Sequence, residues 1–341
     1  MIKSKIIILI ILASGMLFSQ SKVGTTAANF LTIPVGPRAA GMGGAFTAVA
    51  NDVTTAYWNP GGLSRIGDIE FTASFAQWIA GTKLNWFGLN YQIDEDDAVA
   101  LSIDQLDYGQ GEVTTPDQPD GTGENWSAAD LCFAFSYARN LTDRFSIGGT
   151  IKYINQKIWN ESASAFALDI GLLYYTELPG LNIGMNISNF GTEMQLAGKD
   201  LLQPVDIDPA HAGNNASIAS NLSTSSWPLP LQFTVGLGYE FINNENWKWT
   251  VASDAVIPSN QTSYLNIGTE LVWNNLFSIR GGYYSLSRGG GQIVNQSARG
   301  GLSGGVGLHY NFGGFFGKID YSYTSFGIFD PINRISISLG L

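Results

Sequence analysis

Residues 145–154 read FSIGGTIKYI, and side-chain character alternates along this stretch with a period of two. One parity holds the larger apolar side chains, Phe145, Ile147, Ile151 and Tyr153, and the other holds Ser146, Gly148, Thr150 and Lys152. Because successive side chains of a β-strand point to opposite faces, this pattern predicts a strand with one apolar and one polar face. The alternation recurs from residue 68 onward, as in ISISL at 335–339. The chain is therefore predicted to be all-β.

About fourteen segments of this kind follow one another, and an even number is typical of a bacterial outer-membrane barrel. Most run to about ten residues or more, which is enough to cross a bilayer at a tilt. Strands of soluble sandwiches are usually about half as long. We expect a transmembrane antiparallel β-barrel over residues 68–341, with these strands: 68–80, 83–93, 96–108, 125–139, 143–157, 161–176, 181–191, 229–241, 246–256, 262–273, 276–287, 301–312, 315–326 and 332–341.

The connections between these strands alternate between tight turns and long loops. Turn signals such as Asn274-Asn275 occupy every second junction, and the long loops are 108–124, 192–228 and 288–300. Short turns on one rim and long loops on the other are typical of outer-membrane barrels. We therefore predict the bacterial outer membrane as the location, with the N and C termini both in the periplasm. Tryptophans near strand ends fit headgroup anchors, although core aromatics of a soluble β domain are the alternative.

Composition excludes several other classes of protein. The 341 residues include 41 glycines, only 13% are charged, and the net charge is −11. The mean hydropathy of +0.06 leaves no room for repeated apolar helices of about 20 residues. Plentiful aromatic residues argue against disorder, and the negative charge argues against nucleic-acid binding. With Cys132 as the one cysteine, an intrachain disulfide and a thiolate zinc site are excluded.

The first residues have the layout of an export signal. Lys3 and Lys5 precede a short apolar run at 6–13, and small and polar residues follow. The run is too short to span a membrane, so residues 1–20 are predicted to be a cleaved signal peptide. A buried N-terminal strand is the alternative.

Residues 21–67 do not alternate and form a separate region. They contain GPRAAGMGGAFTAVAND at 36–52 and AYWNPGGL at 56–63, in which small residues permit close backbone packing and Asn59-Pro60-Gly61 signals a turn. A barrel of about fourteen strands is wide enough to need filling or to conduct. We expect this region to fold into the lumen as a plug. Its candidate functional residues are Arg38, Gly41, Met42, Gly43, Gly44, Phe46, Asn51, Asp52, Trp58, Asn59 and Pro60.

The run from Gly36 to Leu63 resembles the N-terminal signature of the PorV/PorQ family, which is related to the FadL-type long-chain fatty-acid transporters. The resemblance covers the plug motif closely and the barrel layout loosely. It implies a fourteen-stranded outer-membrane barrel with an N-terminal hatch. The PorV branch is linked to type IX secretion, where it shuttles cargo at the cell surface. Gly61 stands where the FadL hatch motif has alanine, which weakens any carry-over of fatty-acid gating.

No catalytic site, metal site or cofactor is predicted. His211 lies in the longest loop beside Asp206 and Asp208, but the spacing of a calcium loop is missing. Parity places His309 in the lumen, where a nearby serine would imitate a phospholipase, although no Ser/His spacing indicates one. The other residues expected to face the lumen are Lys152, Lys318 and Asp320.

Three functions remain open. The first is a type IX secretion-associated component that binds exported proteins or other secretion components through loops 108–124 and 192–228. The second is a FadL-like channel for hydrophobic small molecules, with Met42, Phe46 and Trp58 along its path. The third is a structural barrel with a closed lumen. Outer-membrane lipid is an expected partner in each case, and nucleic acid in none.

Overall fold

The computed structural model describes residues 24–211, 217–286, 301–327 and 329–341. The predicted signal peptide at 1–20 and the predicted long loop at 288–300 lie outside these residues. No helix within the described ranges is both long and apolar enough to cross a membrane.

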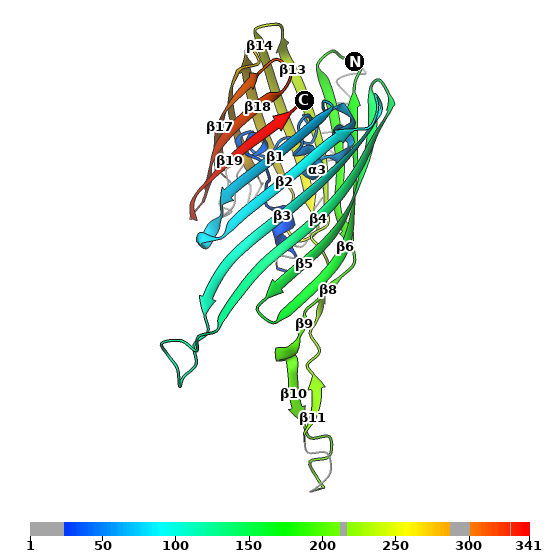
Figure 1. The fold of residues 1–341 in the computed structure, drawn as a ribbon. Helices are drawn as coiled ribbons and strands as arrows, with labels where there is room; N and C mark the ends of the chain where they lie inside the picture. The colour runs from blue at the N-terminus through cyan, green and yellow to red at the C-terminus, as the bar shows by residue number, and fades with distance from the viewer. Residues whose placement is uncertain (1–23, 212–216, 287–300, 328) are drawn as a thin grey trace, which may run out of the picture.

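Fourteen antiparallel strands close into one barrel, which confirms the predicted fold (Figure 1). The closure is complete because β5 pairs with both β4 and β6, and β1 pairs with both β2 and β19. The barrel strands are β1 (Ile69–Gln77), β2 (Lys83–Gln92), β3 (Asp97–Glu112), β4 (Asn125–Thr142), β5 (Phe145–Ile158), β6 (Glu161–Tyr175), β7 (Leu181–Gly191), β13 (Gln232–Asn243), β14 (Trp247–Pro258), β15 (Tyr264–Trp273), β16 (Phe277–Leu286), β17 (Gly301–Asn311), β18 (Phe316–Phe326) and β19 (Phe329–Gly340).

The polar face of each strand points inward and the apolar face points outward. In β1, Glu70, Thr72 and Ser74 are buried, whereas Phe71 and Phe75 are 41% and 42% exposed. A soluble barrel would place its apolar residues inside. This reversed arrangement is the one that lipid around the barrel requires.

The connections sort onto two rims as expected, and the long-loop rim carries the larger excursions (Figure 1). The connection from β7 to β13 contains the short elements β8 (Met194–Gln195), β9 (Ala197–Gly198), η4 (Lys199–Leu201), β10 (Leu202–Val205), β11 (Ile218–Asn221) and β12 (Ser226–Trp227). Strands β10 and β11 pair into a two-stranded ribbon that projects well beyond the barrel (Figure 1). Strands β3 and β4 also extend past the other strands at this rim (Figure 1).

Residues 24–66, which we name the N-terminal segment, run along the barrel interior from one rim to the other. The segment contains η1 (Asn29–Thr32), α2 (Pro37–Gly41), α3 (Thr55–Trp58) and η2 (Pro60–Arg65), and a further turn, η3 (Ile79–Gly81), joins β1 to β2. At the long-loop rim, the Ala27 N–H donates to Pro228 O at 3.0 Å. At the short-turn rim, the Arg65 guanidinium donates to Asp143 O at 3.0 Å.

The C terminus lies at the short-turn rim, where the Leu341 N–H donates to Ile69 O at 3.0 Å. The described chain therefore begins and ends at opposite rims. The predicted placement of both termini on one side involves residues 1–23, which lie outside the described residues. The N-terminal segment passes through the lumen before the first strand begins.

Candidate functional site

Inward-facing glycines of the wall receive the backbone of the N-terminal segment. A Cβ on Gly148 would lie 2.3 Å from Pro60 O, and a Cβ on Gly184 would lie 2.1 Å from Thr47 O. Both distances are far below van der Waals contact, so only glycine permits this approach. The same holds for the other wall glycines that touch the segment: Gly171, Gly236, Gly268 and Gly282. They form three pairs of direct cross-strand partners along the arc of wall from β5 to β16, namely Gly148 with Gly171, Gly184 with Gly236 and Gly268 with Gly282.

Asn59 binds the segment to itself and to the wall. Its Nδ2 donates to Thr47 O at 2.7 Å and to Leu172 O of β6 at 2.9 Å. Its Oδ1 accepts from the Gly61 N–H at 3.1 Å and so caps η2, which begins at Pro60. The side chain is fully buried. The predicted turn at this motif is therefore also the polar anchor of the segment.

Two of the three aromatic residues of the motif, Phe46 and Trp58, pack against each other within the segment. Phe46 is fully buried and meets the Trp58 ring edge-on, with 6.3 Å between centroids. The Trp58 indole N–H donates to Val35 O at 3.0 Å. Met42 is also fully buried and lies in the same apolar cluster as Phe46. These contacts hold the segment in shape, and Trp58 also lines a cavity in the lumen.

Arg38 carries the strongest polar link between segment and wall. Its guanidinium forms a two-pronged pair with Glu270 of β15, at 2.8 Å and 2.6 Å, and also contacts Asp52 at 3.0 Å and Asn51 at 2.7 Å. Burial alone would lower the pKa of Arg38, but the Glu270 and Asp52 carboxylates outweigh it and hold the pKa above its ordinary value. Arg38 therefore stays charged at every pH at which the protein is folded.

The wall continues this chain of charges. Glu270 also accepts from Arg280 of β16 at 2.6 Å, and Arg280 contacts Asp320 of β18 at 2.5 Å. Lys318 of β18 contacts Glu70 of β1 at 3.1 Å. We name these groups together with Arg38 and Asp52 the charged layer.

A cavity of about 230 Å³ lies on the short-turn side of the charged layer, and we name it the turn-side cavity. Three of the four residues expected to face the lumen gather here, namely His309, Lys318 and Asp320. The His309 ring packs against Phe316 at 5.2 Å between centroids.

Lys152 lies apart from this group, in the long-loop half of the lumen. Its Nζ contacts Asp169 at 2.6 Å and donates to Asn189 Oδ1 at 2.9 Å. Asn189 has φ of +63° next to a bulge between β6 and β7. Lys152 also lines a second cavity of about 30 Å³, the loop-side cavity, whose other lining residues include Thr47, Trp58, Asn186 and Asp254.

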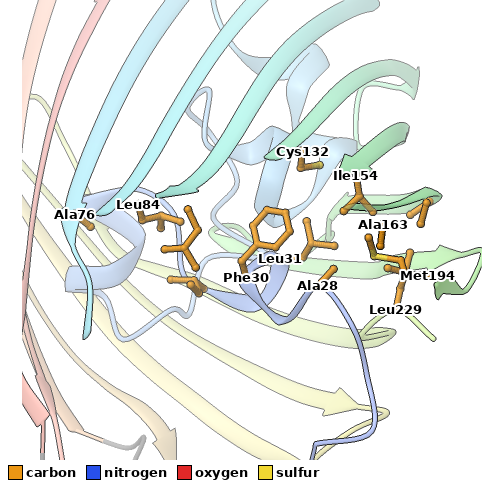
Figure 2. Packing of buried hydrophobic residues seen from close by; sticks show 14 of the residues in the cluster. Ala28, Phe30, Leu31, Ala76, Leu84, Cys132, Ile154, Ala163, Met194 and Leu229 are labelled. Atoms are coloured by element: carbon orange, nitrogen blue, oxygen red, sulfur yellow. The ribbon is translucent and has the colours of Figure 1, made fainter. Parts of the chain in front are cut away.

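An apolar cluster lies in the lumen towards the long-loop rim (Figure 2). Phe30 and Leu31 of η1 lie at its centre, between Leu84 on one side and Ile154 and Met194 on the other (Figure 2). All of these side chains are buried.

Sequence reasoning missed the partners on the wall. Glu270 and Arg280 had a usable signal, because each is a charged residue on the polar parity of its strand. Phe30 and Leu31 had none, since a single apolar pair in a non-periodic region indicates no particular neighbour.

The two histidines do not form a reactive group with one another. His211 pairs with Asp208 at 2.9 Å in the exposed loop, while His309 lies in the turn-side cavity. Within the residues that the structure describes, no hydrogen bond joins a histidine ring to a serine. No group of three or more His, Cys, Asp or Glu side chains suited to a metal ion occurs in those same ranges.

Comparison with known proteins places the chain in a family. Residues 17–210 match the family described as "Type IX secretion system protein PorV". No curated protein sequence matches the chain.

Similar solved structures include the Ralstonia pickettii toluene transporter TbuX, with TM-score 0.53, 14% identity, and coverage of 89% of this chain and 97% of that chain. The CymD monoaromatic hydrocarbon channel has a TM-score of 0.55 and 13% identity, and the match covers 92% of this chain and 97% of that chain. A Pseudomonas aeruginosa FadL homologue has a TM-score of 0.50 and 12% identity, and the match covers 90% of this chain and 98% of that chain. At such low identity these structures establish the fold alone. The sequence match, together with a closed fourteen-stranded barrel, confirms the resemblance seen in the motif: this chain belongs to the PorV family of type IX secretion system proteins.

Proposed function

We propose that this outer-membrane barrel is a type IX secretion component that binds exported proteins at its long-loop rim. Membership of the PorV family supports a role in secretion. The observation that carries the binding role is the ribbon formed by β10 and β11, which stands clear of the barrel (Figure 1).

The ribbon exposes apolar side chains beyond the barrel wall. Leu202 and Ile207 are 51% and 61% exposed, and Leu222 at the base of the ribbon is 55% exposed. An isolated two-stranded ribbon is marginally stable in water at best. Within the ribbon, Val205 and its cross-strand partner Ile218 are 40% and 36% exposed, and exposed apolar side chains that lie together are typical of a protein-binding surface. A bound protein would cover them and stabilise the ribbon.

We propose that the short-turn rim faces the periplasm, which places Leu341 there and the ribbon outside the cell. The sorting of short turns and long loops supports this orientation. We further propose that the N-terminal segment is a plug, because it occupies the interior from rim to rim and is bound to the wall through Asn59 and Arg38. The role is then binding, with no reaction catalysed.

The test is removal of the ribbon. The Leu222 N–H donates to Leu201 O at 2.9 Å, so a short turn can replace residues 202–221 without moving the ribbon's base. The Val113 N–H likewise donates to Glu124 O at 2.9 Å, which allows a matched removal of residues 114–123 from the other long loop. We expect the first deletion to abolish capture of exported proteins while heat-modifiable migration on gels reports a folded barrel. Unchanged capture after the first deletion, or loss of capture only after the second, would refute the proposal.

A FadL-like channel for hydrophobic small molecules is the second candidate. The apolar cluster around Phe30 and Leu31 favours it, because it places apolar surface inside the barrel near the long-loop rim. On this alternative, replacing Asn59 or Trp58 by alanine frees the segment and changes the binding of a fatty acid. Binding that is identical in both variants and the parent counts against the channel.

A further inference from the structure

The interior contains two polar cavities that lie one above the other. On β15, Asn266 lines the loop-side cavity and Glu270 lines the turn-side cavity. On β16, Tyr284 lines the loop-side cavity and Arg280 lines the turn-side cavity. The two cavities are thus separated by four residues on each strand, roughly 13 Å of extended chain.

The barrier between the cavities is the backbone of the N-terminal segment. Gly268 and Gly282 are the inward-facing residues between the two cavities on β15 and β16. A Cβ on Gly268 would lie 2.1 Å from Met42 O, and a Cβ on Gly282 would lie 2.4 Å from Gly43 N. One layer of backbone around Met42 and Gly43, seated on wall glycines, therefore divides the interior.

The charged layer holds this barrier closed from the turn side. Arg38 comes four residues before Met42 and is joined to the wall through Glu270 by two charged hydrogen bonds. Glu270 is buried, and burying a charge pair costs free energy that its attraction seldom exceeds. A well-packed apolar contact would stabilise a permanently fixed segment as well. The choice of a charge pair fits a contact that opens.

The chemistry of both cavities determines what would pass. The loop-side cavity is lined by Thr47, Lys152, Asn186 and Asp254 among others. The turn-side cavity is lined by four cationic side chains and four carboxylates: Arg38, Lys248, Arg280, Lys318, Asp52, Glu70, Glu270 and Asp320. Charged and polar groups of this kind stabilise water and ions inside a cavity.

We propose that the barrel contains a gated passage for inorganic ions and small hydrophilic solutes, with the Arg38–Glu270 pair as its gate. Displacement of residues 36–52 from the wall joins the two cavities into one polar path. This activity goes beyond the proposed role in secretion and does not depend on it.

The test is current recorded through the full-length protein in planar bilayers with potassium chloride. We expect the parent to stay almost closed, and Arg38→Gln and Glu270→Gln to raise the open probability about a hundredfold, the scale for breaking a buried ion pair. Arg139→Gln is the matched control, because Arg139 is exposed and pairs with Asp97 at 3.7 Å away from the segment.

The two variants should differ in ion selectivity. Removing Arg38 leaves an excess of carboxylates in the turn-side cavity, so the reversal potential in a salt gradient shifts towards that of potassium. Removing the charge of Glu270 leaves an excess of cationic side chains in the turn-side cavity, so the reversal potential shifts towards that of chloride. A leak caused by general loosening of the segment would give both variants the same selectivity.

A thiol in the loop-side cavity locates the path. Ser188 lines this cavity, and the control is Arg38→Gln alone, in which the one cysteine, Cys132, is buried. In Ser188→Cys combined with Arg38→Gln, a charged methanethiosulfonate should block the current. The proposal is overturned if folded gate variants stay closed, if their selectivities agree, or if modification at position 188 leaves the current unchanged.

Discussion

Replacing Asn59 by alanine tests the anchoring of the N-terminal segment. The change removes three buried hydrogen bonds, two donated by Nδ2 to Thr47 O and Leu172 O and one accepted by Oδ1 from the Gly61 N–H. Thr47 O and Gly61 N–H are left buried without these partners, and each such group costs about 1–3 kcal/mol. We therefore expect the free energy that holds the segment against the wall to fall by about 2–6 kcal/mol.

Amide hydrogen exchange in detergent micelles measures this loss, because the segment can open while the barrel stays closed. Protection of residues 55–66 should fall by several orders of magnitude, while protection of the β5–β6 pair stays unchanged. Asn333→Ala is the control, because the Asn333 side chain accepts a hydrogen bond from Tyr321 OH at 2.6 Å on the outer face, away from the N-terminal segment. Equal protection of the segment in Asn59→Ala and the parent would refute this anchoring role.

Three further substitutions test the packing and the membrane face. Gly148→Ala should destabilise the protein by about 1–3 kcal/mol in urea unfolding through overpacking against Pro60, whereas Gly149→Ala should not, because a Cβ there meets only Asp169 O at 3.7 Å. Phe30→Ala should cost about 3–5 kcal/mol in the same assay, and a cost below 1 kcal/mol would contradict the packing of Figure 2. Ile151→Lys, at a site 57% exposed in the middle of β5, should cost about 2–4 kcal/mol in lipid, whereas Leu141→Lys at the short-turn rim should cost at most about 1 kcal/mol. Similar costs for the two lysines would contradict the membrane placement.

The barrel could be predicted from sequence because its signal is local. Strand β5 was expected at 143–157 and occupies Phe145–Ile158, since alternating side chains within one strand already define both faces. The two rims followed from loop lengths for the same reason. The long-loop end of β3 was underestimated, at 108 instead of Glu112, because polar residues interrupt the alternation there, whereas β4 continues beyond 139 to Thr142 at the short-turn rim.

The interior contacts could not be predicted in this way. Arg38 and Glu270 are separated by 232 positions, and nothing in either local pattern pairs them. The small residues of the segment indicated close packing, but the wall glycines that receive them were read only as parts of strands. The path of the segment through the lumen also depends on these long-range contacts.

The central claim is that the ribbon at the long-loop rim binds exported proteins. Its most direct test is affinity purification of the tagged parent and of the variant lacking residues 202–221 from gently solubilised outer membranes, with quantitative mass spectrometry of proteins and lipids. The account predicts that exported proteins sharing a common C-terminal β domain co-purify with the parent and not with the variant. Recovery of the same proteins with both, or of fatty acids alone with the parent, would contradict it.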